Sequence, residues 1–495
     1  MPTYSRRAAR GWLQSRRRAS VTTTCLVMTA ATLVVGQPAA HGQSLPAGSP
    51  EAVTAHPSAL QQSVQPVPSQ SGPTTQPGIP AQTTATTPED ARIDALRQRG
   101  IVNVPSVEDT LVDNWGGFRS TLADYGIGVG GILTGNFTGD MLALPSRTNG
   151  VQRYVGQTAE LDSSNGYIGA TYDLGRIGMT GGLFNFQACY NTSTVGQFPH
   201  GMRVCAAYVD QPLMHHHLDI QAGILANNYQ YANPFVGGAV SAGTLGPSAN
   251  LITLLGLSVG GVGAPGVNVS INFGPWYSKG GIQRSTSLSG PVYEAQEADP
   301  YGLRWSEPGS GVVLIDELGY RRLSAPGIKQ TWVRMAGVGN TSEYSYYPTR
   351  KSTKGQGAGM YFLADHQFTQ TDPRHPRSGI YAGVSYLAAT PEAYTYDQYF
   401  EARVYGIGLL PSRPRDQISI VANRTDAGKP YMEYLHSQHD QTHKQIYNFT
   451  LSYTYHVMRG VYLNGGVVYA VDPAIITNAQ QGNPLLFKLV GVIYL

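Results

Sequence analysis

The sequence predicts an all-β protein in which one antiparallel sheet closes into a transmembrane β-barrel. The clearest evidence is the segment Tyr447–Val457, which alternates between two kinds of side chain. One parity holds Tyr447, Phe449, Leu451, Tyr453, Tyr455 and Val457, and the other holds Asn448, Thr450, Ser452, Thr454 and His456. Successive side chains of a strand point to opposite faces, so this strand has one apolar and one polar face. Its length suits a tilted strand that crosses a bilayer, about 9–11 residues, better than a soluble strand of ~5–6.

Two further observations support a barrel in a membrane. The alternation recurs along the chain to its last residue, and an open sheet edge in lipid would leave backbone groups without hydrogen bonds, so such a sheet must close. Charged residues make up only 13% of the chain, against ~25% in ordinary globular domains, while Gly (59) and Tyr (31) are abundant. Outside the N-terminus no apolar run approaches the ~18 residues of a spanning helix. This combination is more typical of membrane barrels than of helical membrane proteins.

Residues 1–42 are predicted to be a signal peptide. Several arginines precede the apolar region Val21–Gly36, and small residues follow, so we expect cleavage at about residues 40–43. Removing residues 1–42 takes away six arginines and no Lys, Asp or Glu, so the formal net charge falls from +3 to −3. A negatively charged mature chain gives no electrostatic support for a nucleic-acid partner.

Residues 43–88 are predicted to be a disordered linker. They are rich in Pro, Gln, Ser, Thr and Ala and contain almost no large apolar residue. Such a segment cannot bury enough surface to offset the entropy lost on ordering.

Residues 89–127 are predicted to be a short helical segment. Pro88 suits the first turn of a helix over Pro88–Arg99, whose Ile93 and Leu96 share a face. A second helix is predicted after Asn114, a good capping residue. Its spacing places Phe118, Leu122 and Tyr125 on one face, and Gly126 is expected to end it.

The start of this second helix carries a family resemblance. The motif Asn-Trp-Gly-Gly-Phe-Arg at residues 114–119, followed by Leu-Ala-Asp-Tyr-Gly-Ile, strongly resembles the opening of the carbohydrate-selective porins (OprB type) of Gram-negative outer membranes. Three later segments resemble the same family, namely the glycine-rich strand end and Arg-Pro-x-Asp turn of Gly406–Asp416, the strand Tyr361–Gln367 and the penultimate strand Val468–Pro473. The resemblance covers about residues 109–495. Near residues 445–448 this chain has Gln445 and Asn448 where the family often has glutamates, so no role of those carboxylates is carried over.

The resemblance implies an architecture and a function. Residues 89–127 would form a helical plug at the periplasmic mouth, and residues 128–495 would form a barrel of about 16 strands in the outer membrane. The channel would allow passive, substrate-selective diffusion of sugars or polyols without a cofactor. Its partners would be carbohydrate solutes, outer-membrane lipid and lipopolysaccharide, and two further copies if it forms the trimer common among porins.

Individual strands are predicted from the alternation. The first are Val129–Phe137, Ser164–Leu174 and Arg176–Gln187, with a tight turn around Gly175. Later ones centre on residues 218–224, 267–273, 331–335, 360–365, 400–404, 418–423, 447–457 and 484–495. The stretch Tyr231–Pro265 lacks clear alternation and is predicted to be a loop, either folded into the lumen or containing a buried helix near Leu251–Leu257.

The candidate solute-contacting residues are polar and aromatic side chains on the inward parity. A sugar has apolar ring faces bordered by hydroxyls, so aromatic faces beside hydrogen-bonding groups would bind it weakly enough to let it pass. The candidates on strands are Glu317, Trp332, Arg334, Asp365, Glu401 and Arg403. Trp115 and Arg119 would join them if the leading helix enters the barrel mouth. The alternative for each charge is a structural role beside a neighbouring strand, and for Trp115 it is packing against the wall.

Histidine and cysteine do not predict a metal site. His215, His216 and His217 follow a turn signal, and adjacent residues rarely chelate one ion, so a solvated turn is expected. His436, His439 and His443 are expected in a loop and lack a carboxylate cluster. Cys189 and Cys205 could form a disulfide between neighbouring strands in an oxidising compartment, or could remain two unpaired small residues.

Three other functions are compatible with a barrel. They are a general porin with little preference for sugars, a channel for polysaccharide export, and an outer-membrane hydrolase. An enzyme is the least favoured, because no nucleophile–base spacing, phosphate-cradling loop or cysteine-rich metal motif stands out.

Overall fold

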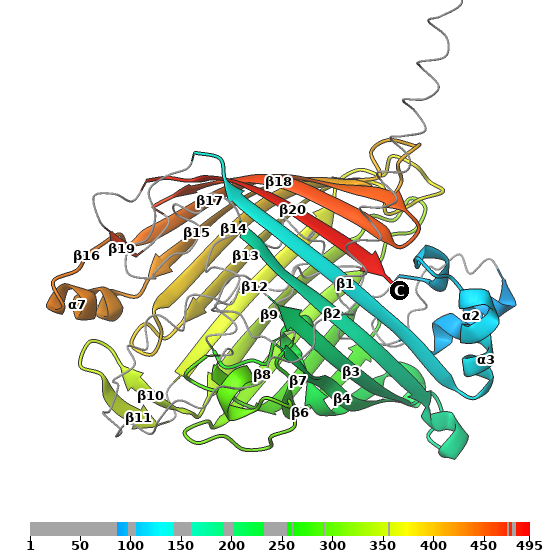
Figure 1. Cartoon of the computed structure of the whole chain (residues 1–495), viewed down its shortest axis with the longest axis horizontal. Coiled ribbons are helices and arrows are strands. Elements are labelled where there is room, and N and C mark those ends of the chain that lie inside the picture. Colours follow the sequence, from blue (N-terminus) through cyan, green and yellow to red (C-terminus); the bar gives the residue numbers. More distant parts are fainter. Residues whose placement is uncertain are drawn as a thin grey trace, which may run out of the picture. The chain divides into compact units, whose positions relative to one another are not determined.

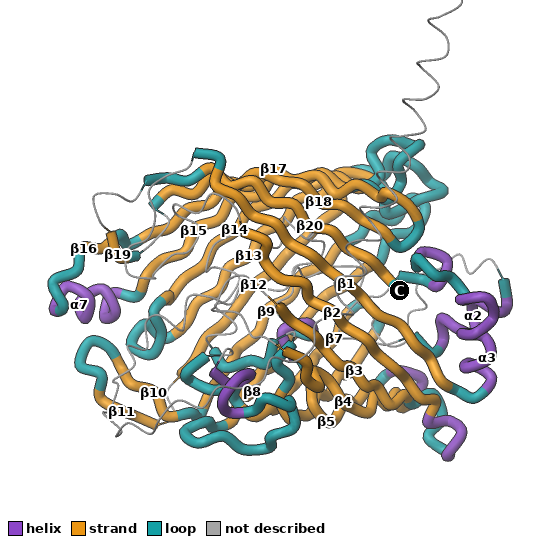
Figure 2. Tube along the Cα trace, viewed as in Figure 1, coloured by secondary structure: helices purple, strands orange, loops and turns teal. Residues whose placement is uncertain are grey.

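The computed structural model describes residues 87–97, 105–142, 160–192, 201–231, 255–259, 261–290, 293–354, 357–472, 475–477 and 482–495. The predicted signal peptide and nearly all of the predicted linker lie outside these residues. Strands dominate the described part of the chain (Figure 2). Among the described helices, none is long and apolar enough to cross a membrane.

Sixteen described strands follow one another in chain order around a closed antiparallel barrel (Figure 1). They are β1 (Ile127–Asp140), β2 (Glu160–Asp173), β3 (Leu183–Thr192), β4 (Gly201–Leu213), β5 (Leu218–Leu225), β6 (Ala264–Phe273), β7 (Trp276–Arg284), β8 (Val312–Arg322), β9 (Thr331–Asn340), β12 (Gly357–Gln367), β13 (Gly379–Ala389), β14 (Tyr396–Ile407), β15 (Gln417–Ala427), β17 (Gln445–Met458), β18 (Val461–Val471) and β20 (Leu485–Tyr494). Two small sheets in the loops pair β10 (Glu343–Tyr346) with β11 (Lys351–Lys354), and β16 (Gln441–Thr442) with β19 (Ile476–Thr477).

The first and last strands close the barrel. β1 pairs with β20 in a continuous register from Ile132 opposite Tyr494 to Asp140 opposite Leu486. Because every barrel strand then has two neighbours, the backbone donors and acceptors of the wall are satisfied within the sheet. The predicted closed barrel is therefore confirmed.

The two faces of the wall follow the predicted alternation. On β17, Phe449 and Leu451 are 50% and 48% exposed, whereas Asn448 and Thr450 are 1% and 2% exposed. The buried parity faces the concave interior, since residues of that parity from separate strands, such as Glu317 on β8 and Tyr361 on β12, meet there. The outer face thus carries apolar side chains and the inner face polar ones.

Two sequence predictions about strands and loops need correction. The strand predicted over Arg176–Gln187 is wrong in its first half: Leu174–Ile177 form a 3-10 turn, and β3 begins only at Leu183. Gly178 and Gly181 adopt positive φ, which ends the regular strand conformation there. The loop predicted for His436, His439 and His443 is wrong for His436 alone, because Lys429–Ser437 form the helix α7, with Pro430 in its first turn. His439 and His443 lie outside helices and strands, as predicted.

The long loop between β5 and β6 reaches the inner face of the barrel. Of the predicted loop Tyr231–Pro265, the described residues Leu255 and Leu257 are fully buried with Val313, Ile315 and Tyr361. Leu255 approaches the wall so closely that a Cβ at Gly359 would lie 2.6 Å from its side chain. The Leu251–Leu254 part of the alternative helix lies outside the described residues.

The N-terminal helical segment lies at the end of the barrel where short turns join the strands (Figure 1). Its helix α2 (Pro88–Ala95) begins at Thr87, whose hydroxyl accepts a hydrogen bond from the Asp90 backbone N–H. The predicted face with Ile93 and Leu96 is buried, and Leu96 O accepts a hydrogen bond from Thr171 on β2. The helix ends earlier than the predicted Arg99.

The second helix, α3 (Phe118–Asp124), uses a different face from the predicted one. Phe118 and Tyr125 are exposed, while Arg119 and Ala123 are buried. Phe118 instead packs edge-to-face on Trp115, with 5.4 Å between ring centroids. Helical spacing identified the helix but could not show which side it presents to the barrel.

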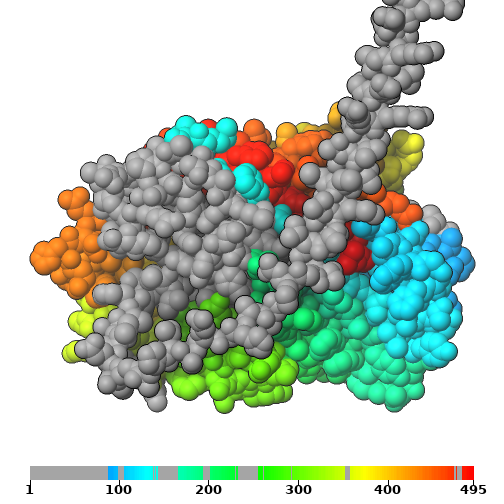
Figure 3. Space-filling view, viewed as in Figure 1, coloured from blue at the N-terminus to red at the C-terminus, as the bar shows by residue number. Residues whose placement is uncertain are grey.

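Asp109 fixes this segment to the last strands. It lies in a 3-10 turn (Val107–Asp109) and is almost completely buried. Its carboxylate accepts hydrogen bonds from Tyr462 Oη and the Gly460 backbone N–H, lies 3.1 Å from His456 Nε2, and forms an ion pair of 2.7 Å with Arg415. Leu111 N also donates to Tyr494 O, and the atoms of the segment adjoin those of the red C-terminal strand (Figure 3).

The facing of β17 predicts opposite effects for two adjacent substitutions. Phe449→Arg should impair barrel insertion by about 2–4 kcal/mol near the bilayer midplane, because it places a charge on the lipid face. Asn448→Leu should insert with a much smaller loss. Urea titration of folding into lipid vesicles, followed by the heat-sensitive gel mobility of folded barrels, measures both. Normal insertion of Phe449→Arg together with failed insertion of Asn448→Leu would show that the faces are reversed.

Loss of the Asp109 carboxylate should release the N-terminal segment while leaving the barrel folded. Asp109→Ala removes the acceptor shared by Arg415, His456, Tyr462 and Gly460 N, so residues 105–113 should become sensitive to limited proteolysis. Asp113→Ala is the matched control, since among the described residues the Asp113 carboxylate forms an ion pair with a single partner, the exposed Arg459 of the β17–β18 turn. Equal protease resistance of the two variants would contradict the anchoring role.

Candidate functional site

The six candidates on strands lie together on the inner face. Glu317 is on β8, Trp332 and Arg334 are on β9, Asp365 is on β12, and Glu401 and Arg403 are on β14. All six are buried, with at most 8% exposure. Strand register explains the grouping, because Trp332 pairs with Asp365, Asp365 with Gly383, and Gly383 with Arg403 in one row across four strands.

Arg403 joins two carboxylates on this row. Its Nε and Nη2 donate to Asp365 Oδ1 and Oδ2 at 2.9 and 2.5 Å, and its Nη1 donates to Glu401 Oε1 at 2.8 Å and to Ser385 Oγ at 2.7 Å. The Arg403 guanidinium can reach across β13 to Asp365 because Gly383 has no side chain. A Cβ at Gly383 would lie 2.2 Å from Asp365 Oδ1. All three nitrogens are therefore engaged by the wall itself, which stabilises the charges away from bulk water.

Tyrosines complete the environment of these carboxylates. Tyr405 Oη donates to Asp365 Oδ1 at 3.0 Å, and Tyr399 Oη donates to Glu401. Tyr405 also stacks on Tyr381, with ring centroids 5.0 Å apart and planes at 9°. This part of the wall presents stacked aromatic rings directly beside a charged network.

A second network surrounds Glu317. Tyr277 Oη donates to Glu317 Oε1 at 2.7 Å, Tyr361 Oη donates to Oε2, and Arg334 Nη1 lies 3.8 Å from Oε2. Trp332 Nε1 donates to Tyr277 Oη at 2.9 Å, which links the indole to the same carboxylate. Tyr277, Trp332, Tyr381 and Tyr405 form one buried aromatic cluster, so the two networks are contiguous.

Arg334 differs from Arg403 in having free hydrogen-bonding capacity. Its guanidinium carbon lies 3.8 Å from the centroid of the Trp332 ring, which favours a cation–π contact, and Arg321 approaches the same ring at 4.8 Å. Arg334 Nη2, however, has no hydrogen-bond partner although the side chain is 3% exposed. A buried guanidinium donor without an acceptor is uncommon in folded proteins.

Trp115 and Arg119 do not join these networks. Trp115 is 58% exposed at the short-turn end of the barrel and packs on Phe118. Arg119 is buried inside the N-terminal segment, where its Nη1 donates to Thr110 Oγ1 at 3.1 Å and to Asp113 O at 3.0 Å. Neither residue shares a hydrogen bond or ring contact with the strand candidates in the described structure, and a contact of either with the solute stays a prediction.

Sequence reasoning missed the tyrosines that complete the networks. Tyr361 and Tyr405 share the parity of Asp365 and Arg403 on their strands, so the alternation could have identified them. Tyr277 and Arg321 lie on β7 and β8, whose alternation is weaker in the sequence. Their convergence on Trp332 depends on the strand register.

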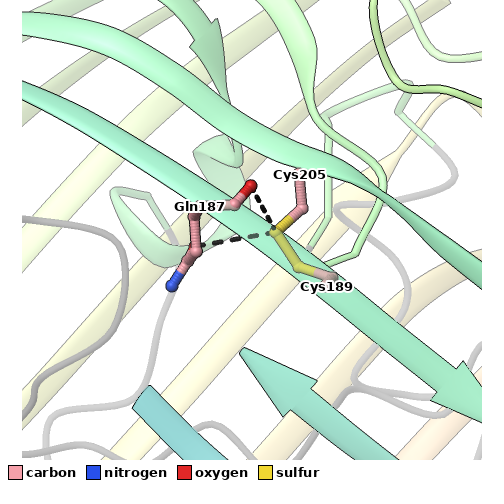
Figure 4. Close-up of a disulfide and its surroundings, with 3 residues drawn as sticks. All are labelled: Gln187, Cys189 and Cys205. Atoms are coloured by element: carbon pink, nitrogen blue, oxygen red, sulfur yellow. Dashed lines mark hydrogen bonds between the residues drawn. A yellow bond between two sulfur atoms is a disulfide. The ribbon is translucent and has the colours of Figure 1, made fainter. Parts of the chain in front are cut away.

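His216 lies in a turn, and Cys189 and Cys205 form a disulfide. His216 lies in the turn Met214–His216 and contacts Asp219, in agreement with the predicted turn. Within the described residues, no group of three His, Cys, Asp or Glu side chains could hold a metal ion. Cys189 on β3 is bonded to Cys205 on β4, with 5.8 Å between Cα atoms, and the Cys205 sulfur lies 3.5 Å from Gln187 O (Figure 4). A β-bulge at Cys205 places both sulfurs on the inner face.

Comparisons with known proteins agree with this geometry. A family model described as "Carbohydrate-selective porin, OprB family" matches residues 177–489, well over half of the chain. The high-pH structure of Pseudomonas putida OprB is similar with a TM-score of 0.64 and 16% identity, covering 78% of this chain and 99% of that chain. The low-pH structure of the same protein gives a TM-score of 0.50 and 14% identity, covering 79% and 100%. At such identities the likeness of structures shows the fold alone. No curated protein sequence matches the chain.

Proposed function

The chain belongs to the OprB family of carbohydrate-selective porins, and we propose that the buried network on β8–β14 is where this outer-membrane channel selects its solute. Family and fold make the protein a carbohydrate porin with a closed 16-strand barrel. The proposal adds that Glu317, Trp332, Arg334, Asp365, Glu401 and Arg403 line the narrow part of the path.

One observation carries this proposal. Aromatic rings, carboxylates and guanidinium groups from six strands, β7, β8, β9, β12, β13 and β14, converge on one stretch of the inner face, and the Arg334 Nη2 donor there has no protein partner. A pyranose ring could lie against an aromatic face while its hydroxyls accept from Arg334 and donate to Glu317. Such contacts are individually weak, as a diffusion channel requires for release.

The charged groups favour this function over a general porin. In a wide, unselective pore, charged side chains face water and act mainly on dissolved ions. Here the charged side chains are paired with one another beside aromatic rings. No bond has to be made or broken for diffusion, so we propose no catalytic role for this site.

The outer face supports contact with outer-membrane lipid. Apolar side chains such as Phe400, Ile420 and Phe449 are about half exposed on neighbouring strands. We propose that they face the acyl chains, whereas contact with lipopolysaccharide and assembly as a trimer stay predictions from the general behaviour of porins.

Sugar should block the ion current through the purified protein in planar bilayers. We expect saturable block by glucose, and Arg334→Ala should weaken that block by roughly tenfold, the effect of losing a hydrogen bond to a charged donor. Arg374→Ala is the control, because Arg374 lies in an exposed turn and pairs only with Asp372. Stable channels indifferent to glucose and to larger saccharides would contradict selectivity and indicate a general porin.

Removal of the Arg403 charge should change the ion preference of the channel. Arg403→Ala leaves Asp365 and Glu401 without their shared cation, so the reversal potential in a KCl gradient should shift toward cation selectivity. Arg403→Lys retains the charge and should preserve the wild-type potential. If both variants assemble and give the wild-type reversal potential, this row does not lie on the conducting path.

A further inference from the structure

A second, uncharged part of the inner face lies beside the charged network. It is formed by β15, β17 and β18, and its side chains are amides and hydroxyls rather than ions. Its members are Asn423, Thr425, Asn448, Thr450, Ser452 and Asn464, each at most 4% exposed. We call this surface the neutral strip.

The neutral strip retains unused hydrogen-bonding groups. Asn423 Nδ2, Thr425 Oγ1, Thr450 Oγ1 and Asn464 Oδ1 are buried and have no hydrogen-bond partner. Buried polar atoms in native proteins nearly always have partners, so four free atoms on three adjacent strands need an explanation. Neither backbone strain nor an ionic role explains the unpartnered atoms, because they belong to neutral side chains on regular strands.

The remaining polar atoms of the strip fix its geometry. Asn448 Nδ2 donates to Asn423 Oδ1 at 3.1 Å, Ser419 and Ser452 hydroxyls lie 2.6 Å apart, and Asn464 Nδ2 donates to Thr454 Oγ1 at 2.6 Å. The free groups are therefore held by partly bonded neighbours. Amides offer both donors and acceptors, and each threonine hydroxyl can act as either.

Strand register joins the strip to the charged network. Glu401 pairs with Asn423 and Asn423 with Asn448, while Arg403 pairs with Val421 and Val421 with Thr450. Neighbouring strands lie about 4.8 Å apart, so Thr450 is only ~10 Å from Arg403 along the wall. A monosaccharide held against one surface would come within reach of the other.

We propose that the neutral strip is a second binding surface that recognises the hydroxyls of uncharged sugars and polyols. The proposal rests on the function proposed above and assigns specificity within it. The hydroxyls of one sugar can accept from Asn423 Nδ2 and donate to Thr450 Oγ1, which occupy diagonal positions on adjacent strands. None of the six side chains of the strip carries a charge that would attract an ion. The charged network would then govern ion passage, and the strip would favour neutral polyhydroxylated solutes.

Thr450→Val tests the strip, because it replaces a hydroxyl by a methyl of similar size. The dissociation constant for current block by glucose and by sorbitol should rise about 2- to 10-fold, as expected for one lost hydrogen bond. The conductance without sugar and the reversal potential in a KCl gradient should stay at wild-type values, unlike those of Arg403→Ala. Thr425→Val should behave in the same way if its hydroxyl also contacts the solute.

Thr331→Val is the matched control. It makes the same chemical change on the outward parity of β9, where Thr331 Oγ1 already contacts His366 Nδ1 at 2.8 Å. Heat-sensitive gel mobility shows that each variant has assembled. Wild-type glucose block in assembled Thr450→Val and Thr425→Val would overturn the strip while leaving the proposed function intact. Absence of glucose block in the wild-type protein would overturn the proposed function and the strip with it.

Discussion

The requirement that every backbone hydrogen bond be satisfied within lipid determines this structure. Pairing of β1 with β20 meets it by closing the sheet, and closure gives each strand one lipid face and one interior face. The alternation along β17 then places Phe449 outward and Thr450 inward. Once the register is fixed, Trp332, Asp365 and Arg403 fall on one row, so the site is a consequence of the closed wall rather than of any single loop.

Within that wall, the charged network lies on β8–β14 and the neutral strip lies on β15, β17 and β18. Arg403 is saturated by Asp365, Glu401 and Ser385, whereas Arg334 keeps a free donor beside Trp332. On the adjacent strands β15, β17 and β18, the side chains of the neutral strip are uncharged, and four of their polar atoms have no partner. In our proposal, the network whose hydrogen bonds are satisfied within the wall sets the electrostatic field there, and the unsatisfied groups beside it contact the solute.

The alternation of side chains was enough to predict the barrel, the inward parity of Glu317 and Arg403, and most of the later strands. It could not predict where β3 begins, because the turn after Leu174 depends on backbone conformation at Gly178 and Gly181. It could not show that Trp115 and Arg119 lie apart from the strand networks, since the N-terminal segment is held by contacts of Asp109 with partners more than 300 positions away in sequence. Convergence of Tyr277, Glu317 and Tyr361 likewise depends on register, which no local pattern contains.

The most direct test of this account is an experimental structure of the protein bound to glucose at a concentration that blocks the current. We expect glucose on the inner face between β8 and β17, with its ring against the aromatic cluster and its hydroxyls within hydrogen-bonding distance of Arg334 Nη2 or of the neutral strip. Glucose bound only at the loops or the N-terminal segment, with the inner face of β8–β17 unoccupied, would contradict the central claim that this wall selects the solute.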